Sequence, residues 1–398
     1  MFRNSYKPRN SRYSNNRGRS RFSRNRNRTQ SLGIHESHYV KKAMLKNTEQ
    51  ETFTPKLKFA ELPVHDRLKQ NIITHGYLKP TPIQDGAIMP ILEGKDVIGI
   101  ADTGTGKTAA FLIPIIEKII KNDNESVLII APTRELAQQI QTEFRSFTQG
   151  MRIYSCLCIG GSYIRNQIHE IRRNPHVIIG TPGRLKDLIE RKALNLSVFN
   201  TIILDEVDRM LDMGFIQDIK YLISLLPPKR QSLFFSATVS NPIKTIIQSF
   251  LTDPITIAMK KREGSEHINQ DIVRVENGAY KIDVLTELLK KEDFKKVMIF
   301  GRTKLGVEKL SKSLYQKGFR VASIHGDKPQ FQRKEALRLF KEGKVNILVA
   351  TDVAARGIDV PNITHVINYD QPATYEDYIH RIGRTGRANQ VGHALTFV

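Results

Sequence analysis

The fold of this chain is decided by one stretch, Ile100-Ala101-Asp102-Thr103-Gly104-Thr105-Gly106-Lys107-Thr108. The apolar run before it predicts a buried strand, and the apolar, alanine-rich run from Ala109 to Ile120 predicts a helix after it. Glycines between a strand and a helix let backbone N–H groups converge on phosphate oxygens, while the lysine reaches the outer phosphates and the threonine hydroxyl holds Mg²⁺. The stretch therefore predicts a nucleotide site with magnesium. One position departs from the general pattern G-x-x-x-x-G-K-[ST], because its first glycine is Ala101 here.

A second motif supplies carboxylates. The apolar run Thr201–Leu204 is followed by Asp205-Glu206-Val207-Asp208. Next to a phosphate loop, Asp205 suits Mg²⁺, held through water, and Glu206 suits a general base that polarises the attacking water. Acidic residues at a strand end are often only a solvated turn, but the pairing with a phosphate loop favours the catalytic interpretation.

The charge of the chain points to an acidic partner. The 398 residues carry a formal net charge of +22, which favours nucleic acid. Residues 1–30 contain nine Arg, one Lys and no Asp or Glu, with too few large apolar residues to offset the entropy of ordering. We expect this tail to be disordered and to bind RNA phosphates nonspecifically; the alternative is a solubilising tail.

Apolar strand-like runs alternate with amphipathic helices along the rest of the chain, which predicts α/β architecture with parallel sheets. We expect a tail and lead-in over residues 1–54, with a short helix possible at Val40–Leu45, a nucleotide-binding domain over 55–257, a linker over 258–268 and a second domain over 269–398. The expected strands of the two domains are Val97–Ala101, Val127–Ala131, Ile153–Ile159, Val177–Ile179, Thr201–Leu204 and Ser232–Ser236, then Ile272–Val275, Val297–Phe300, Val321–Ile324, Ile347–Ala350, His365–Asn368 and Ala394–Val398.

Several classes of protein are disfavoured. No apolar run approaches the ~18 residues of a membrane span, and Met1-Phe2-Arg3-Asn4 begins no apolar signal segment, so we expect neither membrane insertion nor secretion. The two cysteines, Cys156 and Cys158, would point to the same face of one strand and are poor disulfide partners. We therefore expect a reducing compartment, which is the cytoplasm, or the nucleus in a eukaryote. We also expect a monomer.

Further motifs occur in a fixed order. They are Phe59, Gly76-Tyr77-Leu78-Lys79-Pro80-Thr81-Pro82-Ile83-Gln84, Pro132-Thr133-Arg134-Glu135-Leu136-Ala137, Gly160-Gly161, Thr181-Pro182-Gly183-Arg184, Ser236-Ala237-Thr238, Gly301-Arg302-Thr303, Gln330 with Arg333, Thr351-Asp352, Gly357-Ile358-Asp359 and His380-Arg381-Ile382-Gly383-Arg384-Thr385-Gly386-Arg387. With the two motifs above, this set resembles the DEAD-box ATP-dependent RNA helicases of superfamily 2. The resemblance implies two tandem RecA-like domains. That family tolerates Ala101. Val207 replaces the usual alanine of the signature box, for which we expect altered packing rather than lost activity. Family members run somewhat further than Val398, so we expect a final helix to be missing.

The resemblance assigns ATP and Mg²⁺ as cofactors. It implies that Gln84 reads the adenine edge, that Tyr77 stacks on the base, and that Arg384 and Arg387 are arginine fingers. The implied ATP-binding residues are Phe59, Tyr77, Lys79, Gln84, Ala101, Asp102, Thr103, Gly104, Thr105, Gly106, Lys107 and Thr108, with Gly357 and Asp359 near the ribose. Thr108 and Asp205 would hold Mg²⁺, and the implied catalytic residues are Glu206, Lys107, Arg384 and Arg387.

The resemblance also assigns RNA contacts, which suit phosphates and sugars and so do not read sequence. The implied RNA-binding residues are Pro132, Thr133, Arg134, Gly160, Gly161, Thr181, Pro182, Gly183, Arg184, Arg302, Thr303, Gln330, Arg333, Thr351 and Asp352. Residues that would couple nucleotide state to unwinding are Asp208, Ser236, Thr238 and His380.

The expected function is RNA-dependent ATP hydrolysis with local unwinding of short duplexes or remodelling of RNA–protein complexes. Two other functions remain open at this point. One is an ATP-gated RNA clamp that scaffolds other proteins and barely unwinds. The other is a DNA translocase, which the motif set disfavours. Which RNA and which protein partners the chain binds is left open.

Overall fold

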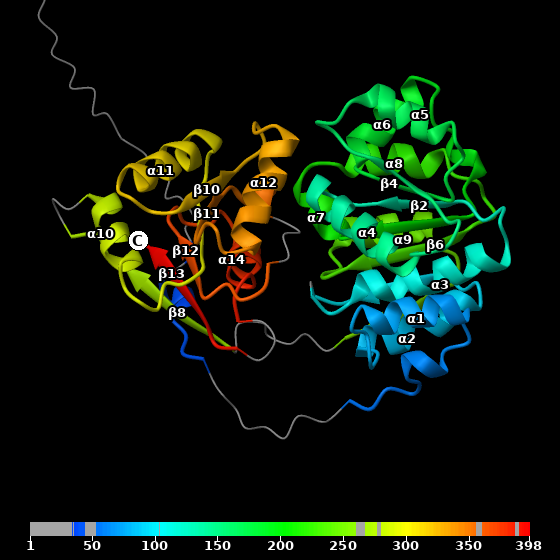
Figure 1. Cartoon of the computed structure of the whole chain (residues 1–398), viewed down its shortest axis with the longest axis horizontal. Helices are drawn as coiled ribbons and strands as arrows, with labels where there is room; N and C mark the ends of the chain where they lie inside the picture. The colour runs from blue at the N-terminus through cyan, green and yellow to red at the C-terminus, as the bar shows by residue number, and fades with distance from the viewer. Residues whose placement is uncertain are drawn as a thin grey trace, which may run out of the picture. The chain divides into compact units, whose positions relative to one another are not determined.

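The structure is a computed structural model that describes Ile34 and residues 36–43, 53–102, 104–259, 267–276, 280–355, 360–386 and 390–398. These residues form two α/β lobes, each built on one parallel sheet (Figure 1). The tail of residues 1–30, most of the expected linker, and Thr103, Gly357, Ile358, Asp359 and Arg387 lie outside the described residues.

The first lobe contains a seven-stranded parallel sheet in the order β3-β4-β2-β5-β6-β1-β7. Its strands are β1 (Val97–Ile100), β2 (Val127–Ile130), β3 (Ser155–Cys158), β4 (Val177–Gly180), β5 (Thr201–Asp205), β6 (Gln231–Ser236) and β7 (Ile255–Ala258). Its helices are η2 (Phe59–Glu61), α1 (Asp66–Thr74), α2 (Pro82–Leu92), α3 (Lys107–Lys121), α4 (Arg134–Phe147), α5 (Ile164–Ile171), α6 (Pro182–Glu190), η3 (Leu196–Val198), α7 (Val207–Asp212), α8 (Ile216–Ser224) and α9 (Asn241–Phe250).

The second lobe contains a six-stranded parallel sheet in the order β10-β11-β9-β12-β13-β8. Its strands are β8 (Ile268–Val273), β9 (Val297–Phe300), β10 (Val321–Ile324), β11 (Ile347–Ala350), β12 (His365–Asn368) and β13 (Gly392–Phe397). Its helices are η1 (Glu36–Tyr39), α10 (Lys281–Leu289), α11 (Lys304–Gln316), α12 (Gln330–Lys341), α13 (Asp352–Ala355) and α14 (Tyr375–Ile382).

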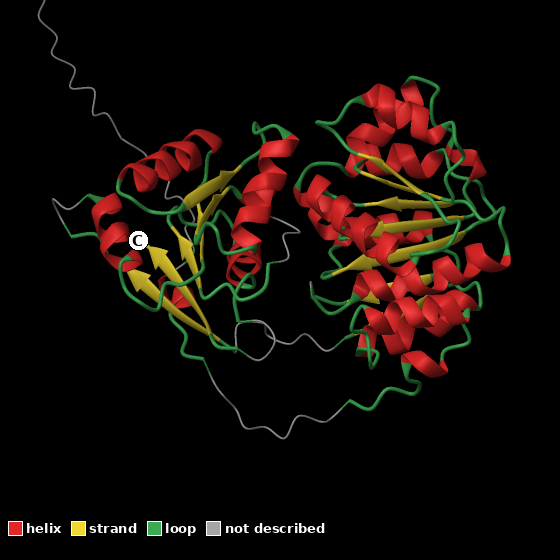
Figure 2. Ribbon diagram, in the orientation of Figure 1, coloured by secondary structure: helices red, strands yellow, loops and turns green. Residues whose placement is uncertain are grey.

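Helices cover both faces of each sheet (Figure 2), and the strands explain why. Alternate side chains of a strand point to opposite faces. In β2, Val127 and Ile129 pack with α1–α4, whereas Leu128 and Ile130 pack with the helices from α5 to α9. All four are fully buried, so this central strand reads as a continuous apolar run. The expected tandem parallel α/β fold is confirmed.

Two parts of the chain differ from the sequence-based expectation. Strand β7 falls in a stretch where the apolar pattern loosens, and β8 begins at Ile268 rather than Ile272. Strand β7 is largely exposed at the edge of its sheet, so pairing with β1 defines it rather than an apolar pattern. The possible helix at Val40–Leu45 is wrong for residues 40–43, because the helical turn lies at Glu36–Tyr39 and Lys41 forms a β-bridge with Gln270.

Two other expectations can be compared with the structure. Cys156 and Cys158 are buried free thiols on β3, with Sγ atoms 3.7 Å apart, as same-face neighbours should be. Among the described helices, none is long and apolar enough to cross a membrane.

Candidate nucleotide and RNA site

The order of the strands sorts the predicted site residues of the first lobe into two groups. The phosphate loop follows β1, the carboxylate motif begins at the end of β5, and Ser236 ends β6. These three strands are neighbours in the sheet. The predicted RNA contacts Thr133, Gly160 and Thr181 follow β2, β3 and β4, which are also neighbours. Because the strands are parallel, all of these residues lie at the carboxyl edge, where ligands bind in α/β sheets. One half of this edge therefore carries the predicted nucleotide residues and the other half the predicted RNA residues.

The phosphate loop has the backbone that a phosphate cradle needs. Gly104 and Gly106 have φ values of +83° and +91°, a left-handed backbone conformation that residues with a side chain rarely adopt. Helix α3 begins directly after Gly106, so its first N–H groups lie at the loop. The Nζ of Lys107 donates a 2.7 Å hydrogen bond to the carbonyl of Ala101. The buried lysine is thus folded back along the loop, where a phosphate would meet its charge.

Residues at the start of α2 hold the phosphate loop in place. Gln84 Nε2 donates to the carbonyl of Gly106 at 3.0 Å, and Thr81 Oγ1 donates to the carbonyl of Thr105 at 2.8 Å. Gln84 Oε1 accepts from the N–H of Thr81 at 2.8 Å. An amide side chain has two donor hydrogens and two acceptor lone pairs, so Gln84 keeps one further donor and one further acceptor for a base edge.

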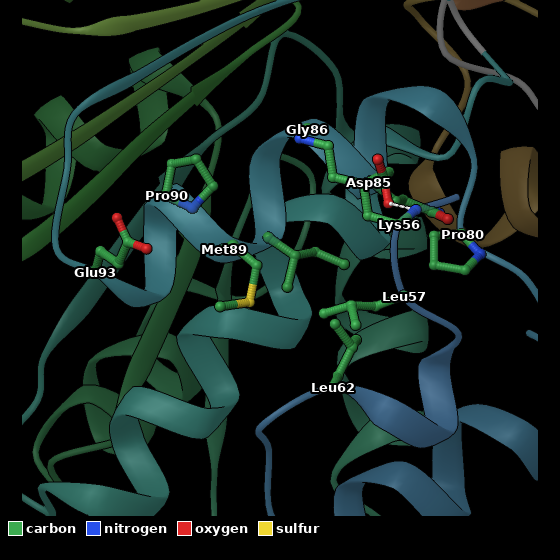
Figure 3. Close-up of a pocket in the computed structure, with 11 residues that line it drawn as sticks. Lys56, Leu57, Leu62, Pro80, Asp85, Gly86, Met89, Pro90 and Glu93 are labelled. Carbon is green, nitrogen blue, oxygen red and sulfur yellow. Dashed lines mark hydrogen bonds between the residues drawn. The ribbon is translucent and has the colours of Figure 1, made fainter. Parts of the chain in front are cut away.

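Gln84 also lines a mostly apolar pocket. The pocket is lined by residues of α2 and of the segment before α1, among them Leu57, Leu62 and Met89 (Figure 3). The N–H of Lys56 donates to Asp85 Oδ1 at 2.8 Å and so fastens that segment to α2.

The predicted aromatic residues lie deeper in the lobe. Tyr77 packs edge-on against Phe59 and Phe147, with ring centroids 5.9 and 5.4 Å away, and its hydroxyl donates to Glu143 at 2.5 Å. Phe59 is fully buried, whereas Lys79 and Asp102 are exposed. The stacking of Tyr77 on adenine stays a prediction.

Asp205 has the environment of a cation ligand. It ends the buried strand β5, and its Oδ1 has no hydrogen-bond partner among the described residues. Burial raises the pKa of Asp205 from 3.8 to about 7, against the opposing effect of the nearby Lys107 charge. An unpartnered buried carboxylate oxygen fits a magnesium ligand, because a cation would restore the charged form. Thr108 lies on the first turn of α3, as the motif requires.

Glu206 adopts a left-handed backbone conformation with φ of +53°, at the turn between β5 and α7. Its Oε2 accepts a 2.7 Å hydrogen bond from Nη1 of Arg209, and both side chains are buried. A non-glycine residue in this conformation costs about 1–3 kcal/mol and persists where the surroundings hold it. The buried ion pair fixes where the carboxylate of Glu206 points.

Asp208 joins the carboxylate motif to the end of β6. Its Oδ2 accepts hydrogen bonds from the N–H groups of Ala237 and Thr238, both at 3.0 Å, and from Thr238 Oγ1 at 3.3 Å. Ser236 Oγ accepts from the N–H of Asp208 at 3.3 Å. The structure therefore brings Asp208, Ser236 and Thr238 together; their coupling role stays a prediction.

The glycine pair explains how Arg134 is placed at the RNA half of the edge. A Cβ atom on Gly160 would lie 3.0 Å from Nη2 of Arg134, and one on Gly161 would lie 2.6 Å from its Nη1. Gly161 also has a φ of +77°. The guanidinium therefore lies directly against this loop, and a side chain on either glycine would push it away.

Arg184 lies on α6, which follows β4, the strand next to β3 in the sheet. Its Nη1 donates to Gln167 Oε1 at 2.9 Å and to the carbonyl of Ser162 at 3.3 Å. Thr133 caps α4 by accepting from the N–H of Leu136. Thr181 is the N-cap residue of α6 without a side-chain capping hydrogen bond, and Pro182 and Gly183 form the first turn of that helix. Helix N-termini, hydroxyls and guanidinium groups together suit phosphate oxygens.

The predicted RNA contacts of the second lobe also follow three neighbouring strands, β9, β10 and β11. Arg302 and Thr303 follow β9, and Thr303 caps α11 by accepting from the N–H of Gly306. Gln330 and Arg333 lie on the first turn of α12, which comes after β10. Thr351 and Asp352 follow β11.

The arginine motif begins on helix α14 and continues past the end of that helix at Ile382. The guanidinium of Arg381 binds both carboxylate oxygens of Asp352, at 2.6 and 2.8 Å, and donates to Asn368 Oδ1 and the carbonyl of Asp370. Arg384 is buried, and its Nε donates to the carbonyl of His380 at 3.1 Å. Asp352, which was expected to contact RNA, thus anchors the helix of the arginine motif; its contact with RNA stays a prediction.

Sequence reasoning missed three residues that shape the site. They are Thr81, which holds the phosphate loop, Arg209, which pairs with Glu206, and Arg381, which fixes α14. A signal for Arg209 was present, because a basic residue three positions after an acidic one on a helix forms ion pairs. Thr81 and Arg381 contact partners far away in sequence, so nothing local marks them.

Comparison with known proteins covers both lobes. Residues 81–246 match the DEAD/DEAH box helicase family, and residues 280–389 match the helicase conserved C-terminal domain. The chain is 46% identical over 344 residues to the ATP-dependent RNA helicase CshA of Limosilactobacillus reuteri, covering 86% of this chain and 69% of that protein. It is 46% identical over 342 residues to the DEAD-box ATP-dependent RNA helicase CshA of Geobacillus kaustophilus, covering 85% and 73%. The chain thus spans about two thirds of the length of these relatives.

Solved structures give the same result. Dbp5 of S. cerevisiae bound to RNA and ADP BeF3 is 32% identical, with a TM-score of 0.74, over 85% of this chain and 89% of that one. Mss116p bound to ssRNA and AMP-PNP is 30% identical, with a TM-score of 0.76, over 86% and 75%. Similarity of this extent over both lobes shows that the chain belongs to the DEAD-box ATP-dependent RNA helicases.

Proposed function

We propose that this chain hydrolyses ATP when single-stranded RNA is bound and uses that cycle to separate short RNA duplexes locally. One observation carries the proposal. The carboxyl edge of the first sheet is divided into a half with the phosphate loop, Asp205 and Glu206 and a half with Arg134 and Arg184. This arrangement supports the proposal, because one sheet would hold ATP beside RNA.

The ATP would be bound by residues of three neighbouring strands and of α2. The loop N–H groups and Lys107 would bind the phosphates, and the remaining donor and acceptor of Gln84 would pair with the adenine edge. Guanine presents a different donor and acceptor pattern, so we expect ATP to be preferred to GTP.

Magnesium would be held by Asp205, with Thr108 nearby. The ion would neutralise charge that develops on the phosphate oxygens. Glu206 would accept a proton from the attacking water, with its carboxylate oriented by Arg209. Hydrolysis would require Arg384 and Arg387 of the second lobe at the γ-phosphate, so nucleotide binding alone would not complete the site. Gly357 and Asp359 would lie near the ribose.

The RNA would be bound through its backbone. The arginines, capping threonines and glycines at the carboxyl edges of both sheets suit phosphates and sugars, which supports recognition without sequence preference. The basic tail of residues 1–30 would add a nonspecific contribution. The buried free thiols Cys156 and Cys158 support a reducing compartment, which we take to be the cytoplasm, and we propose a monomer.

Strand displacement tests the proposal. A short RNA duplex with a fluorescent strand is mixed with the protein, Mg²⁺ and ATP, and release of the strand is followed with and without unlabelled RNA trap. The Glu206→Gln variant serves as the control, because it should bind ATP and RNA without turnover. We expect release with ATP only. Retention on single-stranded RNA without release would favour the clamp, and equal stimulation of hydrolysis by duplex DNA would favour the translocase.

A further inference from the structure

A segment that precedes the first lobe in sequence lies on the second lobe. Ile34 and residues 36–43, which we name the strap, fall outside both stretches that match the family. Lys41 forms an antiparallel bridge with Gln270 of β8 through two backbone hydrogen bonds of 3.0 and 2.7 Å. Strand β8 is at the edge of its sheet, so the strap covers backbone groups that an edge strand would otherwise expose.

One aromatic side chain anchors the strap. Tyr39 is 1% exposed and packs edge-on against Tyr378 of α14, with the ring centroids 4.9 Å apart. Both rings belong to a small apolar cluster with Ile268, Ile382 and Ala394, against which Ile34 also packs. Burial of an aromatic side chain of this size contributes a large part of the free energy that holds a short segment on a surface. Tyr39 is therefore the main contact of the strap.

The strap, strand β8 and helix α14 each contact the other two. The hydroxyl of Tyr378 donates to Gln270 Oε1 at 2.9 Å, and the backbone of Gln270 pairs with Lys41. The N–H of Ala43 adds a 2.9 Å hydrogen bond to Asn269 Oδ1. The strap, the edge strand and α14 are therefore tied to one another in pairs, and loosening one contact would affect the other two.

The arginine motif, which the proposed function assigns to the nucleotide, begins on α14 at His380 and continues past the end of the helix at Ile382. His380, Arg381 and Arg384 lie within six residues of Tyr378 along the chain, and Arg384 Nε is bonded to the carbonyl of His380. We propose that the strap is an integral part of the second lobe and that Tyr39 is a positioning residue, which holds α14 so that Arg384 is presented correctly to ATP. This inference rests on the proposed function, which assigns Arg384 to the γ-phosphate.

The ring of Tyr39, rather than its hydroxyl, makes this contact. Its Oη is buried and has no hydrogen-bond partner among the described residues. Phenylalanine would keep the contact with Tyr378 and remove only the unpartnered oxygen. The pair Tyr39→Ala and Tyr39→Phe therefore separates the packing of the ring from every other property of the position.

The test measures RNA-stimulated ATP hydrolysis of the full chain for both variants, together with amide exchange at Gln270. For Tyr39→Ala we expect kcat to fall by about tenfold or more, because small displacements of a group that acts on the reacting phosphate are costly. The KM for ATP should stay within about twofold, since the phosphate loop, Gln84 and Asp205 belong to the first lobe. Exchange at Gln270 should be faster, and Tyr39→Phe should match the parent chain in all three.

A second variant tests the inference independently, in case Tyr39→Ala fails to fold. Lys41→Pro removes the N–H that bonds to Gln270 and leaves the Tyr39 ring in place, so it should lower kcat in the same direction by a smaller factor. An unchanged kcat in Tyr39→Ala, or a raised KM with kcat unchanged, would overturn the inference. If the parent chain shows no RNA-stimulated hydrolysis at all, the proposed function fails instead, and exchange at Gln270 still reports whether the strap is anchored by Tyr39.

Discussion

Replacing Gly161 by alanine should weaken RNA binding specifically. The new Cβ would lie 2.6 Å from Nη1 of Arg134, at a residue with φ of +77°. The left-handed backbone would cost about 1–2 kcal/mol of folding stability. The guanidinium is the flexible end of its side chain, so it would move away, and one charge-assisted contact with an RNA phosphate, about 1.5–3 kcal/mol, would be lost. This corresponds to a rise of about 10- to 150-fold in the Kd for RNA.

The chain offers a matched control at the opposite end of the same strand. Gly150, in the loop before β3, has a φ of +76°, and a Cβ there would lie 2.5 Å from Nη2 of Arg67. Gly150→Ala therefore introduces the same backbone strain and the same conflict with a guanidinium, away from the carboxyl edge. Both variants should lose similar stability in urea unfolding, and only Gly161→Ala should lose RNA affinity.

The assay is fluorescence anisotropy of a labelled single-stranded RNA with a non-hydrolysable ATP analogue, repeated over a range of salt concentrations. Loss of one phosphate contact should also lower the steepness of the salt dependence by about 0.7 in the log–log slope. ATP affinity should be unchanged in both variants. An equal loss of RNA affinity in the two variants, or none in Gly161→Ala, would refute the role given to the glycine pair and Arg134.

Four further predictions concern the nucleotide site and the tail. Glu206→Gln should bind ATP and RNA normally and lose about 100-fold or more in kcat; normal hydrolysis would disprove the general-base role. Arg387→Ala should lower kcat far more than ATP affinity, and equal losses in a nucleotide titration and a turnover assay would contradict the finger role. Deleting residues 1–30 should weaken RNA binding and flatten its salt dependence, whereas an unchanged slope would make the tail a solubiliser. Because burial raises the pKa of Asp205, its neutral form stabilises the metal-free protein at low pH, and this contribution should be lost as the pH rises from about 4 to about 7. Asp205→Asn should remove that part of the pH dependence of unfolding, and a wild-type curve in the variant would count against it.

Much of the fold could be predicted because its signals are local. The strands around the phosphate loop are apolar runs, and nine of the twelve expected runs begin within one residue of the observed strand. Strand β7 could not be found in this way, since its side chains are mostly exposed and it is recognised by its pairing with β1. The strap was missed for the same reason, because Lys41 pairs with Gln270 across the length of the first lobe.

In the candidate site, too, some features follow from local sequence and others only from the fold. The sequence by itself determined the chemistry, because Gly104, Gly106 and Lys107 act through backbone freedom and charge that neighbours in sequence set. The tertiary structure decided which residues contact one another in the site. Only the fold places Arg134 against Gly161, Arg381 on both oxygens of Asp352, and Tyr39 on Tyr378. These pairs join residues far apart in the chain, and their contacts depend on strand order and packing, which no local pattern encodes.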